Sequence, residues 1–184
     1  MKHRIMMVLL LVGLASGAAA QRPATRFEAV AEVSGKQGTR SMPVSFSVDR
    51  AMTFEDAVRY REVLKSGGQT ALLDVIRQHV CGRILLGAQE LPLNLIFAEK
   101  TSDGWKYVVV TARNFHIDEV QLQTESLDYP FGVAVFTVPD GRRGEGQLLT
   151  RATLAIGADG RATAAGYEGQ TGRLKDIKER EVRR

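Results

Sequence analysis

The sequence offers few residues for cross-links, metal sites or stacking surfaces. Its 184 residues include one cysteine, one tryptophan and three histidines. A lone cysteine cannot form an intramolecular disulfide, so packing alone must hold the fold together. We interpret this residue, Cys81, as a small buried apolar side chain; an intermolecular disulfide or a reactive thiol is the alternative. One tryptophan does not make a stacking platform for nucleic-acid bases.

Long apolar runs are also scarce. The run at residues 5–14 is too short to cross a bilayer, which takes about 20 residues. It follows Lys2 and Arg4 and precedes Ala18 and Ala20, an arrangement typical of a signal peptide that is cut after a small residue. We therefore expect residues 1–20 to be a signal peptide. Residues 21–184 would then act in the periplasm or outside the cell, with no membrane-spanning segment left after cleavage.

Motifs for common chemistries are missing as well. The chain contains no Gly-x-Ser-x-Gly, no HExxH and no glycine-rich loop that ends in Gly-Lys-Ser/Thr. His79 and Cys81 are two positions apart and would face apart on a helix, so they do not predict a nucleophile with its base. The 25 basic and 21 acidic residues include Lys2 and Arg4 of the leader, so the remainder is nearly neutral. That balance gives no case for a nucleic-acid partner, and no cofactor is predicted.

The chain does contain clear strand patterns. Residues 27–33 and 42–48 alternate between apolar and polar side chains around a turn-rich stretch at 34–39, which predicts an antiparallel hairpin. Residues 93–99 and 105–112 flank a turn that ends in Gly104 and predict a second hairpin.

Between these hairpins the period becomes helical. Thr53 and Asp56 have the spacing of a capping box, and the helix that follows should end at Gly67-Gly68. A second helix is expected from about Ala71 to His79, with one face formed by Leu72, Val75, Ile76 and His79. The two together predict a helical hairpin that is inserted after the second strand and lies across a sheet.

For the rest of the chain the sequence predicts mostly strands. Residues 131–138 are apolar on both faces, which favours a central strand covered on both sides. In residues 148–156, alternate positions from Leu148 to Ile156 are expected to share one face. Residues 115–128 fit a strand, a short helix or a loop. A further strand is expected at 161–167, an extended piece at 173–178, and a charged, frayed tail beyond it.

These elements predict one α+β domain at residues 21–184. Its antiparallel sheet should have about seven or more strands, with the helical hairpin inserted. The pattern is compatible with an open sheet and with one that curls towards a barrel. The order of elements, with Asp128-Tyr129-Pro130-Phe131, Gly144-Glu145-Gly146 and the 173–181 end, resembles a group of small exported bacterial proteins of unassigned function. The resemblance implies a similar export route and fold, and no activity.

The best local cluster of polar donors is His116, Asp118 and Glu119. On a strand, His116 and Asp118 would share a face and could begin a metal site; a solvated polar edge is the alternative. The chain also has enough carboxylates for a catalytic pair, and the candidates are Glu119, Glu125, Asp128 and Glu145. No catalytic or metal site is assigned from these patterns.

Three functions fit the sequence. The first is a non-catalytic exported domain that binds an envelope protein or another envelope component. The second is a carrier of a small apolar ligand or lipid, whose cavity would lie within a curved sheet and be lined by aromatic side chains at Phe27, Phe46, Phe97, Trp105 and Phe136. The third is an exported hydrolase that uses carboxylates, with a metal near His116.

Overall fold

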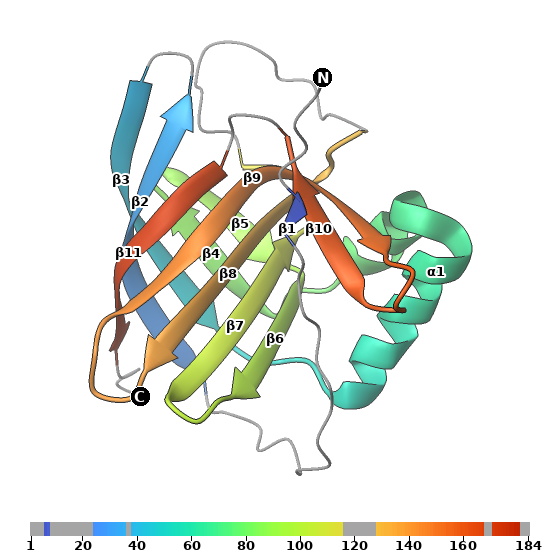
Figure 1. The fold of residues 1–184 in the computed structure, drawn as a ribbon, viewed down its shortest axis with the longest axis horizontal. Helices are drawn as coiled ribbons and strands as arrows, with labels where there is room; N and C mark the ends of the chain where they lie inside the picture. Colours follow the sequence, from blue (N-terminus) through green and yellow to red (C-terminus); the bar gives the residue numbers. More distant parts are fainter. Residues whose placement is uncertain (1–5, 8–23, 36–37, 116–127, 168–170, 181–184) are drawn as a thin grey trace.

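The computed structural model describes residues 6–7, 24–35, 38–115, 128–167 and 171–180. In these segments one helix accompanies one antiparallel sheet (Figure 1). The elements are β1 (Met6–Met7), β2 (Thr25–Gly35), β3 (Gly38–Val48), α1 (Phe54–Ile76), β4 (Gly82–Leu86), β5 (Gln89–Leu93), β6 (Leu95–Lys100), β7 (Gly104–Thr111), β8 (Phe131–Pro139), β9 (Gly144–Ile156), β10 (Ala162–Gly166) and β11 (Thr171–Arg180).

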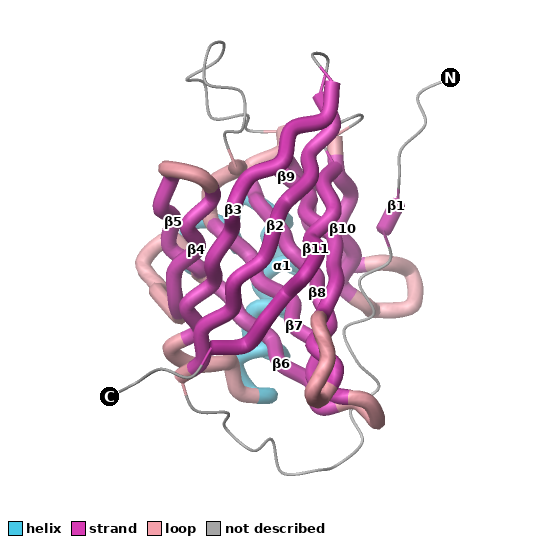
Figure 2. The backbone as a smooth tube through the Cα atoms, turned by 90° about the vertical axis from the view of Figure 1, so that its left-hand side faces the viewer, coloured by secondary structure: helices cyan, strands magenta, loops and turns pink. Residues whose placement is uncertain are grey.

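The sheet has the strand order β5-β4-β3-β2-β11-β9-β8-β7-β6, and β10 extends it from β9. It curls until it is nearly closed, so that the shape is barrel-like. Figure 2 shows β5, β4, β3, β2 and β11 as one wall, with β9, β8, β7 and β6 behind it and α1 behind them. The predicted α+β class and antiparallel sheet are confirmed, and the curled alternative is the one that the chain adopts.

The interior of the curl is filled by aromatic side chains. The ring of Phe136 lies 5.4 Å from Phe27, 4.9 Å from Phe46 and 5.1 Å from Tyr107, measured between ring centroids. All four residues are at most 1% exposed and belong to one buried cluster. Rings at these separations contact each other directly, and their mutual packing stabilises the two walls of the sheet against each other.

A second apolar cluster lies on the outer face of the β6–β9 wall, under α1. It joins Tyr60, Leu64 and Leu72 of the helix to the outward-facing side chains of the wall, such as Val108 and Val133. The strands of this wall are therefore covered on both sides, which explains why residues 131–138 are apolar at consecutive positions. That prediction is confirmed: Ala134 and Phe136 of β8 face the interior, and Val133 faces the helix.

The helical region differs from the predicted helical hairpin. The structure has one helix, α1, with a kink at Gly68, whose backbone angles are φ 68° and ψ −167°. The second part of α1 stays close to the sheet through Leu72, Leu73 and Ile76. The predicted apolar face of this part included Val75. That side chain is 39% exposed, so the prediction is wrong for this one residue.

One hairpin was not expected from the sequence. β4 and β5 pair from Gly82 with Leu93 to Leu86 with Gln89, and β4 then pairs with β3. Their burial alternates, with Ile84 and Leu86 buried between exposed neighbours. The alternation spans five residues in each strand, and Pro92 lies in β5, so the pattern is short and interrupted.

A bulge also shifts side chains between faces. The β8–β9 register slips between the pairs Phe131–Ala152 and Val133–Leu149. As a result Leu148 faces the interior while Ala152 faces the helix, so the expectation that these positions share one face is wrong. The other hairpins follow the predictions: β2 pairs with β3, and β6 with β7.

Candidate functional site

The best polar cluster of the sequence lies outside the described residues. His116, Asp118 and Glu119 all fall in the segment 116–127, as does Glu125. The metal and hydrolase hypotheses that use these residues therefore stay predictions. Across the ranges that the structure describes, no group of three or more His, Cys, Asp or Glu side chains could hold a metal ion.

The remaining candidate carboxylates do not form a pair. Asp128 and Glu145 are both exposed. Asp128 precedes the Phe131–Ala152 end of the β8–β9 pair, and Glu145 lies opposite Thr137 at the other end. At about 3.3 Å per residue, these two ends are roughly 20 Å apart, much further than the two carboxylates of a glycosidase.

Cys81 is buried, as the sequence suggests. It is 2% exposed, and its thiol donates a 3.4 Å hydrogen bond to the backbone carbonyl of Asn94. Burial raises the pKa of the Cys81 thiol, so the reactive thiolate is disfavoured. The His79 ring instead lies edge-on to the ring of Tyr60, with centroids 5.9 Å apart. This environment is that of a structural cysteine.

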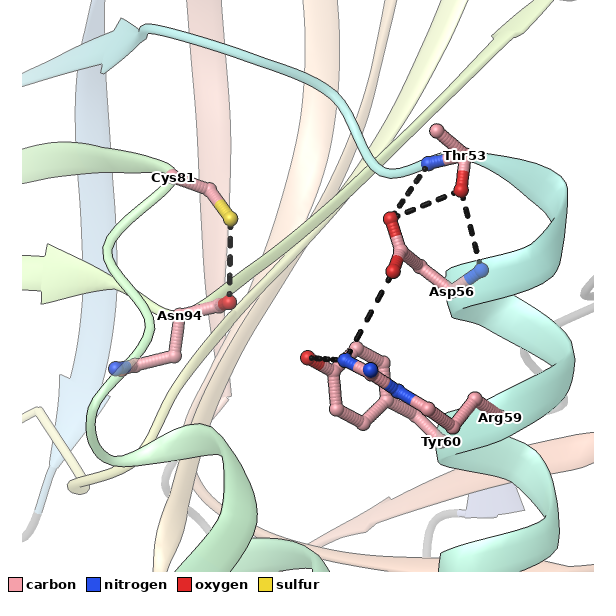
Figure 3. A network of polar contacts seen from close by, with 6 residues as sticks. All are labelled: Thr53, Asp56, Arg59, Tyr60, Cys81 and Asn94. Atoms are coloured by element: carbon pink, nitrogen blue, oxygen red, sulfur yellow. Dashed lines mark hydrogen bonds and ion pairs between the residues drawn. The ribbon is translucent and has the colours of Figure 1, made fainter.

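The two ends of α1 are hydrogen-bonded to Asn94, which precedes β6, and to β6 itself. Figure 3 labels Asn94 and the capping residues Thr53 and Asp56 at the N-terminal end of the helix. At the C-terminal end, the side-chain amide of Asn94 donates to the carbonyls of Ile76 (3.1 Å) and His79 (2.7 Å). Its side-chain oxygen accepts a 2.7 Å hydrogen bond from the backbone N–H of Ala112. Asn94 is fully buried, so these three bonds satisfy its whole amide and fix the helix end to the sheet.

At the N-terminal end, the predicted capping box is present. The Thr53 hydroxyl accepts from the backbone N–H of Asp56 at 3.1 Å, and the Asp56 carboxylate accepts from the Thr53 hydroxyl at 2.9 Å (Figure 3). The hydroxyl of Thr53 lowers the pKa of Asp56. Just before the cap, the backbone N–H of Met52 donates to the carbonyl of Ile96 at 2.8 Å. Helix and sheet are thus held at a set separation at both ends.

Between these two attachment points, α1 and the outer face of the sheet enclose a cavity of about 290 Å³. We call it the α1 groove. It is lined by side chains of α1 and the turn before it, of β6 and β7, and of the β9–β10 hairpin: Met52, Thr53, Phe54, Ala57, Val58, Tyr60, Arg61, Leu64, Leu72, Leu95, Phe97, Ala98, Glu99, Lys106, Val108, Val110, Leu154, Gly160 and Ala162.

The lining is apolar apart from a few side chains. Those that bring polar groups are Thr53, Arg61, Glu99, Lys106 and the hydroxyl of Tyr60. An apolar concave site with a small number of polar groups is the usual form of a small-molecule site. Its volume is at the lower end of the range of roughly 300–1,000 Å³ that such sites span.

The aromatic side chains expected to line a ligand cavity are divided between two places. Phe97 lines the α1 groove. Phe27, Phe46 and Phe136 belong to the filled interior, and Trp105 packs against the same interior cluster. The α1 groove lies on the outer face of the sheet, under the helix, whereas the sequence places the expected cavity within the curl. Residues such as Leu95 and Val108 were missed because alternation shows that a face is apolar but not what covers it.

Comparisons with known proteins give no relative for this chain: no family model, no curated protein and no solved structure matches it. In the described segments, no helix has both the length and the apolar character needed to cross a membrane.

Proposed function

We propose that this protein is an exported, non-catalytic binding protein that holds a small apolar ligand in the α1 groove. The observation behind the proposal is the groove itself, a cavity of about 290 Å³ with an almost entirely apolar lining. Apolar surface that faces a cavity instead of packed atoms loses dispersion contacts, and a ligand that fills the cavity would restore them. A small apolar molecule would therefore gain dispersion contacts in the groove.

The attachments of α1 support a preformed site. Asn94 ties the C-terminal end of the helix to the sheet, and the Met52–Ile96 hydrogen bond ties the N-terminal end. A helix held in this way cannot simply collapse onto β6 and β7 to close the groove. The conformational entropy of the site is thus lost during folding, and ligand binding does not require a further loss.

The interior of the curl is a poorer candidate. The rings of Phe27, Phe46, Tyr107 and Phe136 contact each other there, so a ligand would have to displace packed side chains. For catalysis, the carboxylates Asp128 and Glu145 are exposed and lie at opposite ends of β8. Both observations favour binding at the groove.

Nile red, a neutral dye that fluoresces in apolar surroundings, tests this proposal. We expect the dye to bind the wild-type protein with a blue-shifted emission, and the variant Ala57→Phe to lose most of that signal because the new ring fills the groove. Val75→Phe is the matched control, since Val75 lies on the same helix, is 39% exposed and does not line the groove.

The result that would contradict the proposal is unchanged Nile red binding in a folded Ala57→Phe variant, or no dye binding to the wild type. Circular dichroism and thermal melting show whether each variant is folded. If Ala57→Phe does not fold, Val58→Phe fills the same groove from the next position and replaces it.

The export part of the proposal has its own test. Lys2 and Arg4, the apolar run at 5–14 and the alanines at 18 and 20 predict cleavage before Gln21. In a bacterial host, the mature product should be found outside the cytoplasm with Gln21 at its N-terminus, as measured by intact mass. An uncleaved product that stays in the cytoplasm would contradict this part and leave the binding proposal untouched.

A further inference from the structure

We infer that the ligand of the α1 groove is a single-chain amphiphile with an anionic head group, which lies beside Lys106. This inference rests on the proposed binding function and names the ligand class of the same site. It follows from the order of side chains along the sheet wall, from the charges at one end of that wall, and from the volume of the groove.

The sheet wall of the groove changes from apolar to charged along its length. The cross-strand pairs of β6 and β7 that line it are, in order, Leu95 with Val110, Phe97 with Val108, and Glu99 with Lys106. Leu95 and Val110 are buried, and the last pair is half-buried. A molecule with one apolar end and one polar end matches this sequence of pairs, whereas a wholly apolar molecule would leave the charged pair desolvated.

Lys106 is available to a head group. Glu99 lies directly opposite it, yet in the described part of the chain neither side chain takes part in an ion pair. Two other lysines of the sheet differ in this respect: Lys100 pairs with Asp140 at 2.9 Å, and Lys175 with Glu32 at 2.6 Å. A half-buried ammonium without a partner gains more from an anion than one that is already paired.

The charges around the groove favour an anion over a cation. Arg61 lines the helical wall, and its guanidinium contacts Glu62, its neighbour in sequence, at 3.4 Å, with both side chains about half exposed. The lining therefore holds two cationic groups, Lys106 and Arg61, against the single carboxylate Glu99. Glu62, the partner of Arg61, does not line the groove, so one negative charge on the ligand would balance the charges of the lining itself.

The volume restricts the ligand to one chain. A cavity of about 290 Å³ lies at the small end of known ligand sites, which reach roughly 1,000 Å³. A single alkyl chain fits that limit, and a lipid with two chains would leave one chain in water. A medium-length fatty-acid carboxylate has the required shape and charge.

The test compares three ligands that share a dodecyl chain and differ in the head group: dodecanoate, dodecanol and dodecylammonium. Each competes with Nile red for the wild-type protein at neutral pH, at concentrations at which the ligand is dissolved as a monomer. We expect dodecanoate to bind about threefold or more tightly than dodecanol, the size expected of one partly exposed ion pair. Dodecylammonium should bind more weakly than dodecanol.

Variants then assign the preference to one side chain. Lys106→Gln should remove the advantage of dodecanoate over dodecanol, both measured on the same variant. Lys100→Gln is the matched control, because Lys100 is paired with Asp140 and does not line the groove, and it should keep the preference. Glu99→Gln should increase the preference, since it removes the negative charge opposite Lys106.

The outcomes separate the two proposals. If dodecanol displaces the dye but dodecanoate has no advantage, or if Lys106→Gln keeps the advantage, the head-group inference is wrong and the groove remains a binding site. If Nile red does not bind at all, the proposed function itself fails. Dodecyl phosphate serves as a second anion: a preference for it over dodecanoate would support the anionic class and identify a phosphate head as the better ligand.

Discussion

The side-chain oxygen of Asn94 accepts a 2.7 Å hydrogen bond from the backbone N–H of Ala112, which follows β7. The same side chain donates to two carbonyls at the end of α1, those of Ile76 and His79. One fully buried amide thus joins the helix to two strands of the sheet at the point where β5 passes into β6. The position of α1, and with it the shape of the groove, depends on this residue.

Replacement of Asn94 should therefore be costly. Asn94→Ala removes three hydrogen bonds and leaves the N–H of Ala112 buried without its partner, so we expect the free energy of unfolding to fall by about 3 kcal/mol or more. Urea denaturation measures it. Asn114→Ala is the control: Asn114 is 2% exposed, and its side-chain nitrogen and oxygen have no hydrogen-bond partner within the described segments. Equal losses in the two variants would contradict this account.

The capping box predicts a dependence on acid. Thr53→Ala should lower the free energy of unfolding by about 1 kcal/mol at neutral pH. The Thr53 hydroxyl lowers the pKa of Asp56 in the fold, so the ionised carboxylate contributes stability above its usual pKa and loses it as the pH falls through the lowered value. The gap between wild type and variant should narrow below about pH 4.

The measurement is chemical denaturation at neutral pH and at about pH 3. Ser66→Ala, in the same helix, provides the control, because its hydroxyl donates to the carbonyl of Glu62 and touches no titrating group. A gap between wild type and Thr53→Ala that is constant across this range would show that Asp56 does not act through Thr53.

The kink of α1 predicts a strict need for glycine at position 68. Its φ of 68° and ψ of −167° lie in a region that side-chain-bearing residues avoid, at a cost of about 1–3 kcal/mol. Gly68→Ala should lose that much stability in thermal or urea unfolding. Gly87→Ala, at the turn between β4 and β5 with φ 60°, is a second test of the same kind, because an added Cβ meets nothing within 4 Å at either position and only the backbone conformation opposes the change. A neutral Gly68→Ala variant would contradict the kinked geometry.

Cys81 should resist alkylation in the folded protein. Its thiol is buried, and burial raises its pKa, so iodoacetamide at mildly alkaline pH should react slowly until the protein is unfolded. Because the folded pKa lies above the unfolded one, stability is complete below the usual thiol pKa and is lost as the pH rises through the folded value.

A variant with its cysteine moved to an exposed position provides the control for the alkylation rate of Cys81. Val80 is 49% exposed, so the double variant Val80→Cys, Cys81→Ala places a thiol one position away at the surface, and it should react much faster. Similar rates for the native and shifted thiols would show that Cys81 is accessible.

Sequence reasoning predicted the elements that depend on local pattern. The hairpins β2–β3 and β6–β7 follow from alternation and turn residues, and the start of α1 follows from Thr53 and Asp56. The kink at Gly68 could not be told from a hairpin, since two adjacent glycines are compatible with both. The groove could not be predicted because it depends on which outward-facing residues α1 leaves uncovered, and that is set by long-range attachments such as Asn94.

The place of β11 in the sheet has a consequence for the order of events during synthesis. This strand comes last among the described elements, yet it pairs with β2 on one side and β9 on the other, and Arg180 meets Glu28 across 152 positions. Before β11 has been synthesised, the segments of β2 and β9 that pair with it lack their backbone hydrogen-bond partners. The sheet therefore remains divided between these two strands. A nascent polypeptide therefore cannot complete this wall of the sheet until β11 has been synthesised.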